Sequence, residues 1–575
     1  MKRYWKYIRP YIQYYILGPC FMMMEVVGDV LLPYMLAKII NQGIAEKNVA
    51  YIIKIGAIMG FIAVIMAVGG VLGAWFASKA AMNFGADLRM DLFEKIQQFS
   101  FQNIDNFSTG SLITRLTNDI TQIQNMIMMT LRMCLRSPGI LIGAMVMAFV
   151  ISPKLAAIFI IVLPVLAVLI VVIMRRAFPQ FRTLQEKLDA LNSCIQEGLV
   201  GIRLIKSFVR GDYEEMRFEK RNQQLKEANL TAMKTMLLYT PLMTLALNIT
   251  TVVVVWSGGN MIVAGNMQVG DLTAFTNYIV QIMSSLTMLS IAFLNWARAI
   301  ASFRRVGEVL DEKIDLTDEN AKHKDRAVCE GSVEFQNVSF RYYKNSPEWV
   351  IENISFKLEA GKTLGIIGST GSGKSTLVSM IPRLYDTDEG TVLVDGINVR
   401  DYGLKPLREG IGMVLQNNTL FSGSITENLK WGDEDADEKA VRKAAQNAQA
   451  AGFIDSFKDG YRTCLEQSGN NVSGGQKQRL CIARALLKCP KILILDDSTS
   501  AVDTATERAI REALHSEYKD MTKIIIAQRI RSVMDADEIL VLDNGKTAGF
   551  GTHEQLLADC PVYREIYDVQ NGREE

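Results

Sequence analysis

The stretch TLGIIGSTGSGKST, residues 363–376, places an apolar run directly before a glycine-rich turn that ends in Lys374 and Ser375. The apolar run is typical of a buried β-strand, and the residues after the turn are typical of a helix. Glycines let the backbone bend so closely that consecutive N–H groups point at phosphate oxygens. A lysine in this position reaches the β- and γ-phosphates, and the serine hydroxyl ligates Mg²⁺. A turn without a ligand is the alternative, and the intact order of strand, loop and GKS argues against it.

The sequence therefore predicts a P-loop that binds nucleotide phosphates. Nine residues make up the predicted loop: Gly368, Ser369, Thr370, Gly371, Ser372, Gly373, Lys374, Ser375 and Thr376.

A second apolar run, KILILDD (residues 491–497), ends on two adjacent acids. Such a pair after a hydrophobic strand indicates a metal ligand followed by a catalytic base. Asp496, at the strand end, is predicted to hold the Mg²⁺ shell. A solvated carboxylate at a strand end is the alternative interpretation.

The length and amino-acid composition of the chain limit the classes of protein to which it can belong. The 575 residues predict two or more domains. With 62 Lys+Arg against 61 Asp+Glu, the chain lacks the basic excess of a nucleic-acid-binding protein, so we expect no nucleic-acid partner. Eight cysteines without a CxxC pair, and only three histidines, argue against a disulfide framework and against a zinc site.

Long apolar segments before residue 300 are each near or above the ~20 residues that cross a bilayer. Six such spans are predicted near 12–38, 52–77, 131–151, 155–174, 240–264 and 271–297. Basic residues concentrate at the N-terminus and in the long segments 78–130 and 175–239, which the positive-inside bias places in the cytoplasm. We therefore expect a multi-pass protein of the inner or plasma membrane, with a cytoplasmic N-terminus and a cytoplasmic C-terminal domain.

The composition changes after residue 310. The polar stretch 311–331 lacks apolar periodicity and is predicted to be a linker. Residues 332–575 alternate short β-branched runs with helical stretches, which predicts a soluble α/β nucleotide-binding domain. Residues 1–310 are predicted to form an all-α transmembrane domain with six membrane helices and long cytoplasmic extensions.

A third motif, NVSGGQKQR (residues 471–479), lies between the two phosphate-site stretches. The order of P-loop, SGGQ and apolar strand with acids closely resembles the nucleotide-binding domain of ATP-binding cassette (ABC) transporters. The first half resembles the six-helix domain of ABC exporters, and NFSTGSLITRLTNDI (residues 106–120) resembles the first intracellular loop of that family. The resemblance implies ATP and Mg²⁺ as ligands and a second half-transporter subunit as partner.

The same resemblance implies further roles. Tyr342 matches the aromatic residue that stacks on adenine, with a packing or surface tyrosine as the alternative. Gln416 matches the glutamine that touches Mg²⁺. Asp503, in the segment 500–503, matches the loop that crosses the dimer. The signature that would complete the partner's ATP site is Ser473, Gly474, Gly475 and Gln476. Segments near 104–110 and 206–213 resemble the coupling helices that press on the nucleotide-binding domains.

The sequence departs from the family at two positions. Asp497 stands where the family usually has the glutamate that polarises the attacking water, and Gln528 stands where it usually has a histidine. The shorter acid reaches less far, and an amide carries no charge. We interpret the pair as a degenerate ATP site in one subunit of a heterodimeric exporter. The alternatives are a homodimer that hydrolyses slowly with Asp497, an ATP-binding regulatory subunit, and an importer with the exporter fold.

Charged residues also occur within the predicted spans. Glu25 and Asp29 share one helix face in the first span, and Arg132 and Arg136 have the same spacing near the third. Pairing that supports the fold, or placement in a cytosolic extension, is the favoured interpretation. A binding site for a charged substrate is the alternative. The substrate class stays open among drugs, lipids and peptides.

Overall fold

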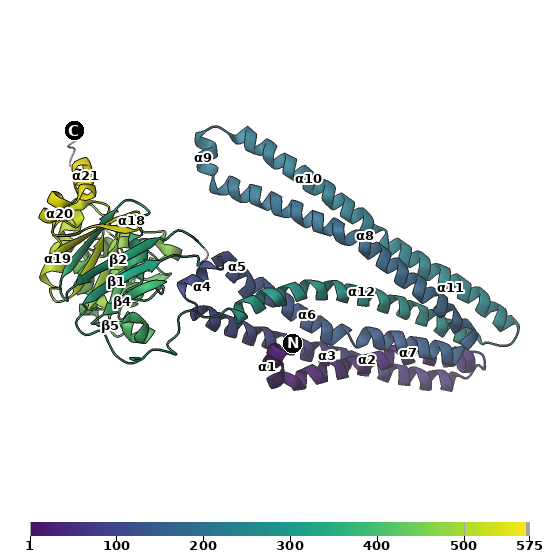
Figure 1. Cartoon of the computed structure of the whole chain (residues 1–575). Helices are drawn as coiled ribbons and strands as arrows, with labels where there is room; N and C mark the ends of the chain where they lie inside the picture. The colour runs from purple at the N-terminus through teal and green to yellow at the C-terminus, as the bar shows by residue number, and fades with distance from the viewer. Residues whose placement is uncertain (1, 345, 499–500, 571–575) are drawn as a thin grey trace. The chain divides into compact units, whose positions relative to one another are not determined.

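The chain folds as two units (Figure 1). The computed structural model describes residues 2–344, 346–498 and 501–570. At residues 2, 290, 291, 293–295, 297 and 298 it describes the backbone alone. One unit comprises Met1–Gln97 and Thr109–Asp311, and the other comprises Gln98–Ser108 and Glu312–Glu575.

The first unit is built from helices. They are α1 (Trp5–Ile8), α2 (Ile12–Lys38), α3 (Val49–Gln97), α5 (Thr109–Thr114), α6 (Ile120–Met133), α7 (Arg136–Ile151), α8 (Pro153–Val200), α9 (Ile202–Ser207), α10 (Gly211–Leu237), α11 (Tyr239–Val263) and α12 (Val269–Asp311). Within this unit α2 packs along α3, α7 packs against α12, and α8 runs beside α10 (Figure 1).

Five helical stretches among the described residues are long and apolar enough to cross a membrane. They are Trp5–Ile44, Val49–Gln97, Thr109–Ile151, Pro153–Val200 and Gly211–Val263. The first four contain one predicted span each, and the fifth contains all but the last residue of the span 240–264. The sixth predicted span, 271–297, falls within α12, which is not among these five stretches, and it stays a prediction.

Glycines allow α2 and α3 to approach each other closely. Gly69 and Gly73 are four residues apart and therefore share one face of α3. A Cβ atom on Gly73 would stand 3.1 Å from the carbonyl oxygen of Gly18, and one on Gly69 would stand 3.0 Å from that of Phe21. Small residues with this spacing bring helix backbones into van der Waals contact in a membrane, where the lipid provides no hydrophobic drive for helix association.

A buried carboxylate ties α12 to the helical turn Arg115–Asp119. Asp119 is fully buried. Arg305 donates two N–H groups to its oxygens, one over 2.8 Å, and the Ser302 hydroxyl donates a third hydrogen bond over 2.8 Å. Arg115 donates to the carbonyl oxygen of Arg305 over 2.7 Å. A bidentate guanidinium with a further donor is the arrangement that offsets the cost of burying a charge.

We expect Asp119→Asn to lower the free energy of unfolding by about 2 kcal/mol or more, because it leaves the Arg305 guanidinium without its counter-charge. Thermal unfolding of the detergent-purified chain measures this. Glu186→Gln removes an exposed carboxylate whose partner, Arg182, is 79% exposed, and should cost less than about 0.5 kcal/mol. Equal shifts in the two variants would contradict a special role for the buried pair.

The second unit is a mixed α/β fold. Its strands are β1 (Val333–Phe340), β2 (Ile351–Leu358), β3 (Thr363–Gly368), β4 (Glu389–Val394), β5 (Ile397–Asn398), β6 (Ile411–Val414), β7 (Gly423–Ser424), β8 (Cys464–Leu465), β9 (Ile492–Asp496), β10 (Thr522–Ile526), β11 (Glu538–Asp543) and β12 (Lys546–Gly551). Its helices are α4 (Phe101–Asp105), α13 (Lys374–Ser379), α14 (Leu404–Glu409), α15 (Ile425–Leu429), α16 (Glu438–Asn447), α17 (Ala451–Ser456), α18 (Gly474–Leu487), α19 (Thr504–Ser516), α20 (His553–Asp559) and α21 (Pro561–Gln570).

One six-stranded sheet has the order β12-β11-β3-β10-β9-β6, in which only the β11–β12 pair is antiparallel. A four-stranded antiparallel sheet has the order β2-β1-β4-β5, and β7 pairs with β8. Strand β9 is buried along its whole length, and β10 and β11 are nearly so. Parallel strands that are covered on both faces have sequences that are nearly unbroken apolar runs. Such strands are therefore easy to predict from the sequence.

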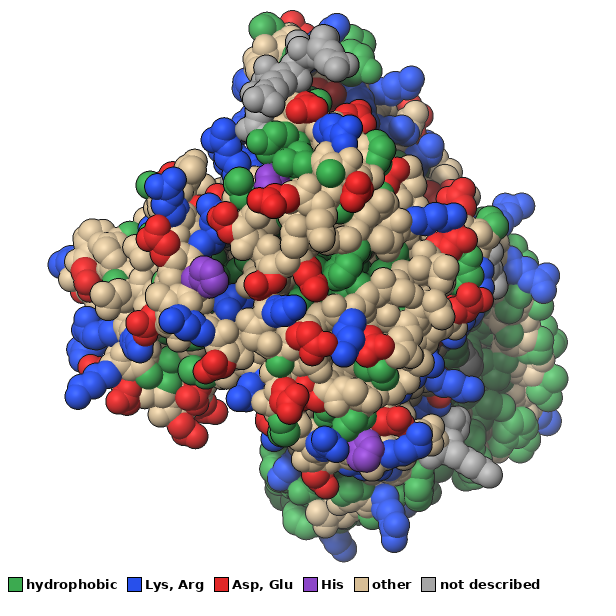
Figure 2. All heavy atoms as spheres, turned by 60° about the vertical axis from the view of Figure 1, so that its left-hand side comes forward, with side chains coloured by type: hydrophobic (Ala, Val, Ile, Leu, Met, Phe, Trp, Pro, Cys, Tyr) green, Lys and Arg blue, Asp and Glu red, His purple; other side chains and the backbone are tan. Residues whose placement is uncertain are grey.

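The polar segment between α12 and β1 is ordered against the second unit. The side chains of Leu316, Ala321 and Val328 are buried. The Asp395 carboxylate accepts the four consecutive backbone N–H groups of residues 329–332 over 2.7–3.1 Å. Acidic and basic side chains are interspersed on the face of this unit that Figure 2 shows, in keeping with the balanced charge of the chain.

Candidate nucleotide-binding site

The predicted P-loop connects β3 to α13. Gly371 and Gly373 have φ angles of +86° and +89°, values that residues with a Cβ atom rarely adopt. A Cβ atom on Gly373 would also stand 2.6 Å from the Ile351 side chain and 2.9 Å from the Val350 carbonyl oxygen, whereas one on Gly371 would meet open space. The loop is therefore wound tightly between the sheet and the start of α13.

Lys374 bends back over this loop. Its Nζ donates to the carbonyl oxygens of Gly368 and Ser369 over 2.9 and 2.6 Å, and lies 3.4 Å from the Ser372 hydroxyl. Burial lowers the pKa of Lys374, while the nearby Asp496 and Asp497 act in the opposite direction. The ammonium group thus stands where the loop would close around a phosphate.

Ser375 and Asp496 meet across the site. The Ser375 hydroxyl donates to Asp496 Oδ1 over 3.0 Å, and Asp496 is buried at the end of β9. Burial raises the pKa of Asp496; the Ser375 hydrogen bond and Lys374 lower it, and Asp497 raises it further. Hydroxyl and carboxylate oxygens are the donors that Mg²⁺ prefers. In the described part of the chain no three His, Cys, Asp or Glu side chains are grouped so that they could hold a metal ion by themselves.

Asp497 and Gln528 stand side by side although they are 31 residues apart in sequence. Gln528 Nε2 donates to Asp497 Oδ2 over 2.9 Å. Asp497 has a φ angle of +47°, and its N–H donates to the carbonyl oxygen of Ile526. Burial raises the pKa of Asp497, and the bond from Gln528 lowers it. The two positions at which the sequence departs from the family are therefore in direct contact.

Gln416 follows β6, whose last residue, Val414, pairs with Leu495 of β9. This places Gln416 at the edge of the sheet where β9 delivers Asp496. The Gln416 side chain is exposed.

Tyr342 lies just beyond β1, beside the P-loop helix. Its hydroxyl is 2.9 Å from the Thr376 Oγ1 atom. Its ring meets those of Phe340 and Tyr385 edge to face, with centroids 5.1 and 5.3 Å apart. The side chain is 37% exposed, so it is partly packed and still has a free ring surface.

The SGGQ residues open α18 in a capping box. Ser473 Oγ accepts the N–H of Gln476, and the Gln476 side chain accepts the N–H of Ser473. A Cβ atom on Gly475 would stand 2.8 Å from the Ala501 carbonyl oxygen, so the segment that leads to Asp503 packs on this turn. Asp503 caps α19 by accepting the N–H and the hydroxyl of Thr506, which lower its pKa. Residues 499 and 500 lie outside the described residues.

Comparison with known proteins identifies the family. The family model described as "ABC transporter transmembrane region" matches residues 15–286, and the model described as "ABC transporter" matches residues 351–500. The chain is similar over 574 residues, at 39% identity, to the uncharacterized ABC transporter ATP-binding protein YfiB of Bacillus subtilis (strain 168), covering 100% of this chain and 99% of YfiB. The chain belongs to the ABC transporter family.

Two further comparisons describe this ABC transporter. A Bacillus subtilis (strain 168) protein with a provisional name, multidrug export ATP-binding/permease protein YgaD, is 33% identical over 584 residues and covers 99% of each chain. The solved structure titled "Structure of a bacterial Atm1-family ABC exporter with ATP bound" superimposes with a TM-score of 0.81 at 24% identity over 98% of both chains. The predicted fold class, a helical transmembrane domain followed by an ABC nucleotide-binding domain, is confirmed, and the chain is a half-transporter with both parts fused.

One contact of the transporter was not predicted from its sequence. Tyr385 donates its hydroxyl to Asp105 of α4 over 2.9 Å, and its ring lies 6.0 Å from that of Phe101. Burial, followed by the bond to Asp105, raises the pKa of Tyr385. Since Tyr385 also touches Tyr342, one ring connects the nucleotide side of the unit to α4. The two partners are 280 residues apart in sequence, and Tyr385 belongs to no motif.

Two short helices overlap the segments that resemble coupling helices, near 104–110 and 206–213. They are α4, at 101–105, and α9, at 202–207. The coupling role of these segments stays a prediction. Ser100 and Asn103 form a capping box that sets the start of α4.

Three of the four charged residues singled out near the predicted spans lie close together. Arg136, at the start of α7, lies 2.8 Å from Glu25 and 3.5 Å from Asp29 of α2. Arg132 lies on α6, before the helix break at Cys134 and Leu135. The contacts fit the favoured interpretation, in which these charges pair within the fold.

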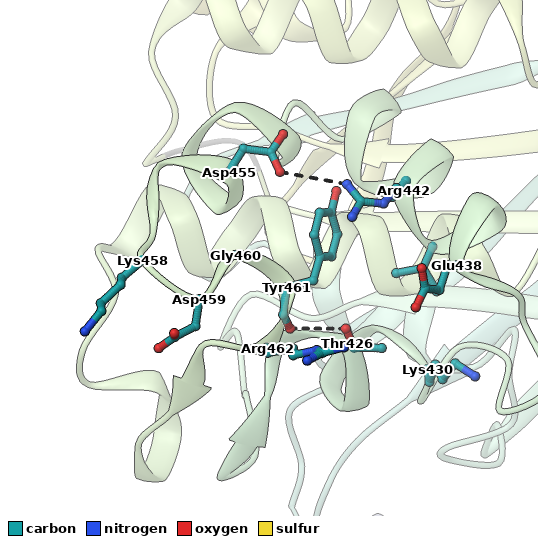
Figure 3. Close-up of a pocket in the computed structure, with 11 residues that line it drawn as sticks. Thr426, Lys430, Glu438, Arg442, Asp455, Lys458, Asp459, Gly460, Tyr461 and Arg462 are labelled. Atoms are coloured by element: carbon teal, nitrogen blue, oxygen red, sulfur yellow. Dashed lines mark hydrogen bonds and ion pairs between the residues drawn. The ribbon is translucent and has the colours of Figure 1, made fainter.

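A surface cavity of about 550 Å³ lies apart from the P-loop, between α15, α16 and α17 (Figure 3). Among its charged groups, Arg442 lies 4.0 Å from Asp455 and over the Tyr461 ring. The Thr426 hydroxyl donates to the Tyr461 carbonyl oxygen.

We expect Gly373→Ala to weaken nucleotide binding more than Gly371→Ala. Both variants bear the strain of a positive φ angle, about 1–2 kcal/mol. Only the Gly373 variant adds contacts with Ile351 and Val350 that the sheet cannot relieve. Titration of the purified chain with a fluorescent ATP analogue compares them, and equal affinities would contradict the loop geometry.

Proposed function

We propose that this chain is one subunit of a heterodimeric, ATP-driven exporter. It binds ATP at a degenerate site of its own and supplies its signature to the competent site of a partner. The observation that carries this proposal is the contact between Asp497 and Gln528. The two unusual side chains contact each other within the site. All residues of the phosphate loop and the Ser375–Asp496 pair are present.

In this proposal the nucleotide is held by residues that the fold brings together. The P-loop backbone and Lys374 bind the phosphates, and Tyr342 stacks on the adenine with its free ring surface. Ser375, Asp496 and Gln416 hold Mg²⁺, which neutralises charge on the phosphates when it is bound.

Hydrolysis at this site is proposed to be slow for two reasons. An aspartate is one methylene shorter than a glutamate, and a displacement of about 1 Å costs on the order of 10²-fold in a step that depends on positioning. In addition, the bond from Gln528 to Asp497 Oδ2 orients the carboxylate toward the amide. A neutral amide also offers the γ-phosphate no positive charge, unlike an imidazolium.

The signature is proposed to serve the partner subunit. Ser473 and Gln476 fix each other through the capping box, so the N-terminal turn of α18 is held in one conformation. The N-terminal turn of a helix, held rigidly in this way, is suited to an anion approaching from outside the chain. Asp503 would lie at the same interface, while also capping α19.

Transport is proposed to run outward from the cytoplasm by alternating access, with a drug, lipid or peptide-like molecule as substrate. The name of YgaD and the exporter fold support this direction. The division into 1–310, 311–331 and 332–575, the six spans, and the cytoplasmic position of both chain ends belong to the same proposal.

We expect the purified chain alone to hydrolyse little ATP, and the chain with its partner to hydrolyse it robustly. Asp497→Asn should change the activity of the pair less than about twofold, because hydrolysis takes place at the other site. Replacing the partner's glutamate should abolish the activity. Strong turnover by the chain alone, lost on Asp497→Asn, would instead support the homodimer.

A gain-of-function test follows from the same contact. Asp497→Glu combined with Gln528→His should raise ATP hydrolysis by the chain's own site by about tenfold to a hundredfold, since it restores both reach and charge. The assay pairs the double variant with a partner whose own glutamate is replaced. Either single substitution should raise ATP hydrolysis less than the double variant does. An inactive double variant would argue that other residues of the site have also lost their function.

A further inference from the structure

The C-terminal helix α21 reaches the loop that carries Gln528. The Gln570 Oε1 atom accepts the N–H of Ile530 over 2.8 Å, and its Nε2 atom donates to the Gln528 carbonyl oxygen over 2.8 Å. One amide thus satisfies a backbone donor and a backbone acceptor two residues apart. Such a two-point contact fixes both the position and the orientation of the loop backbone.

The other end of this connection is the Asp497 carboxylate. The backbone that Gln570 holds is that of Gln528, whose side chain donates to Asp497. Hydrogen bonds therefore run from α21 to the loop 528–530 and from there to the acid beside the metal ligand. The position of the loop decides whether the Gln528 amide can reach that acid.

The helix that provides Gln570 is itself anchored. Tyr563, in its first turn, is fully buried in a cluster with Leu556 and Cys560. Its hydroxyl stands 2.7 Å from His553 Nδ1. Gln570 is exposed at the opposite end, so it extends from a fixed base without contributing to the core.

We propose that Gln570 is a positioning residue for Gln528, and that α21 prolongs the retention of ATP at this site. A loop held in place loses less conformational freedom when nucleotide binds, which strengthens binding. The inference rests on the proposed function only in placing Gln528 beside the nucleotide. It requires no particular rate of hydrolysis.

The test measures release of a fluorescent N-methylanthraniloyl ATP analogue from the full-length chain in detergent, by stopped flow against excess ATP. Gln570→Ala should accelerate release about threefold to tenfold, because two hydrogen bonds to the loop are lost. Gln570→Glu keeps the acceptor for Ile530 and loses the donor to Gln528, so it should also accelerate release. A wild-type rate in both variants would overturn the proposal.

A double-mutant cycle separates positioning from general support of the structure. In a Gln528→Ala background, Gln570→Ala should leave the release rate unchanged, because the side chain through which it acts is gone. The thermal midpoint of the nucleotide-free chain should stay the same in all variants, since Gln570 is exposed. Equal acceleration in both backgrounds would refute the role. With Mg²⁺ withheld by EDTA, release is measured without turnover, so a hydrolytically competent Asp497 would overturn the proposed function and leave this result standing.

Discussion

The nucleotide site depends on the parallel register of three neighbouring strands. In the central sheet Ile366 of β3 pairs with Ile526 of β10, which pairs in turn with Asp496 of β9. The three strands end at the same edge of the sheet. The backbone therefore places the P-loop, Gln528 and Asp496 close together at that edge. A slip of one residue would turn every side chain of a strand to the opposite face, so the apolar runs that bury these strands also fix the chemistry at their ends.

That register explains why the two unusual residues are neighbours. Asp497 and Gln528 each lie one or two residues beyond a strand end, on strands that pair directly. A change at either position alters the surroundings of the other. The Gln528 amide gives the Asp497 carboxylate a hydrogen-bond donor. The two residues therefore form one local unit.

The sequence predicts best those parts whose partners are close along the chain or whose burial is complete. Strands β3, β9 and β11 are continuous apolar runs, and the P-loop and the SGGQ turn have fixed local chemistry. Strand β6 has four residues, two of them Gly412 and Met413, too few to show a period. The contacts of Tyr385 with Asp105, and of Gln570 with the loop at 528–530, join residues 280 and about 40 positions apart. They involve ordinary side chains or backbone atoms, and only the folded chain brings them together.

The contact between α4 and the rest of the second unit affects how the chain can be divided. A cut within the polar segment 311–331 separates Phe101 and Asp105 from Tyr385, although these residues belong to one compact unit. The C-terminal fragment would expose a tyrosine hydroxyl and an aromatic face that the intact chain covers. Its solubility would then be poorer than its interspersed surface charges suggest, and a fragment meant for study in isolation would need a substitute for α4.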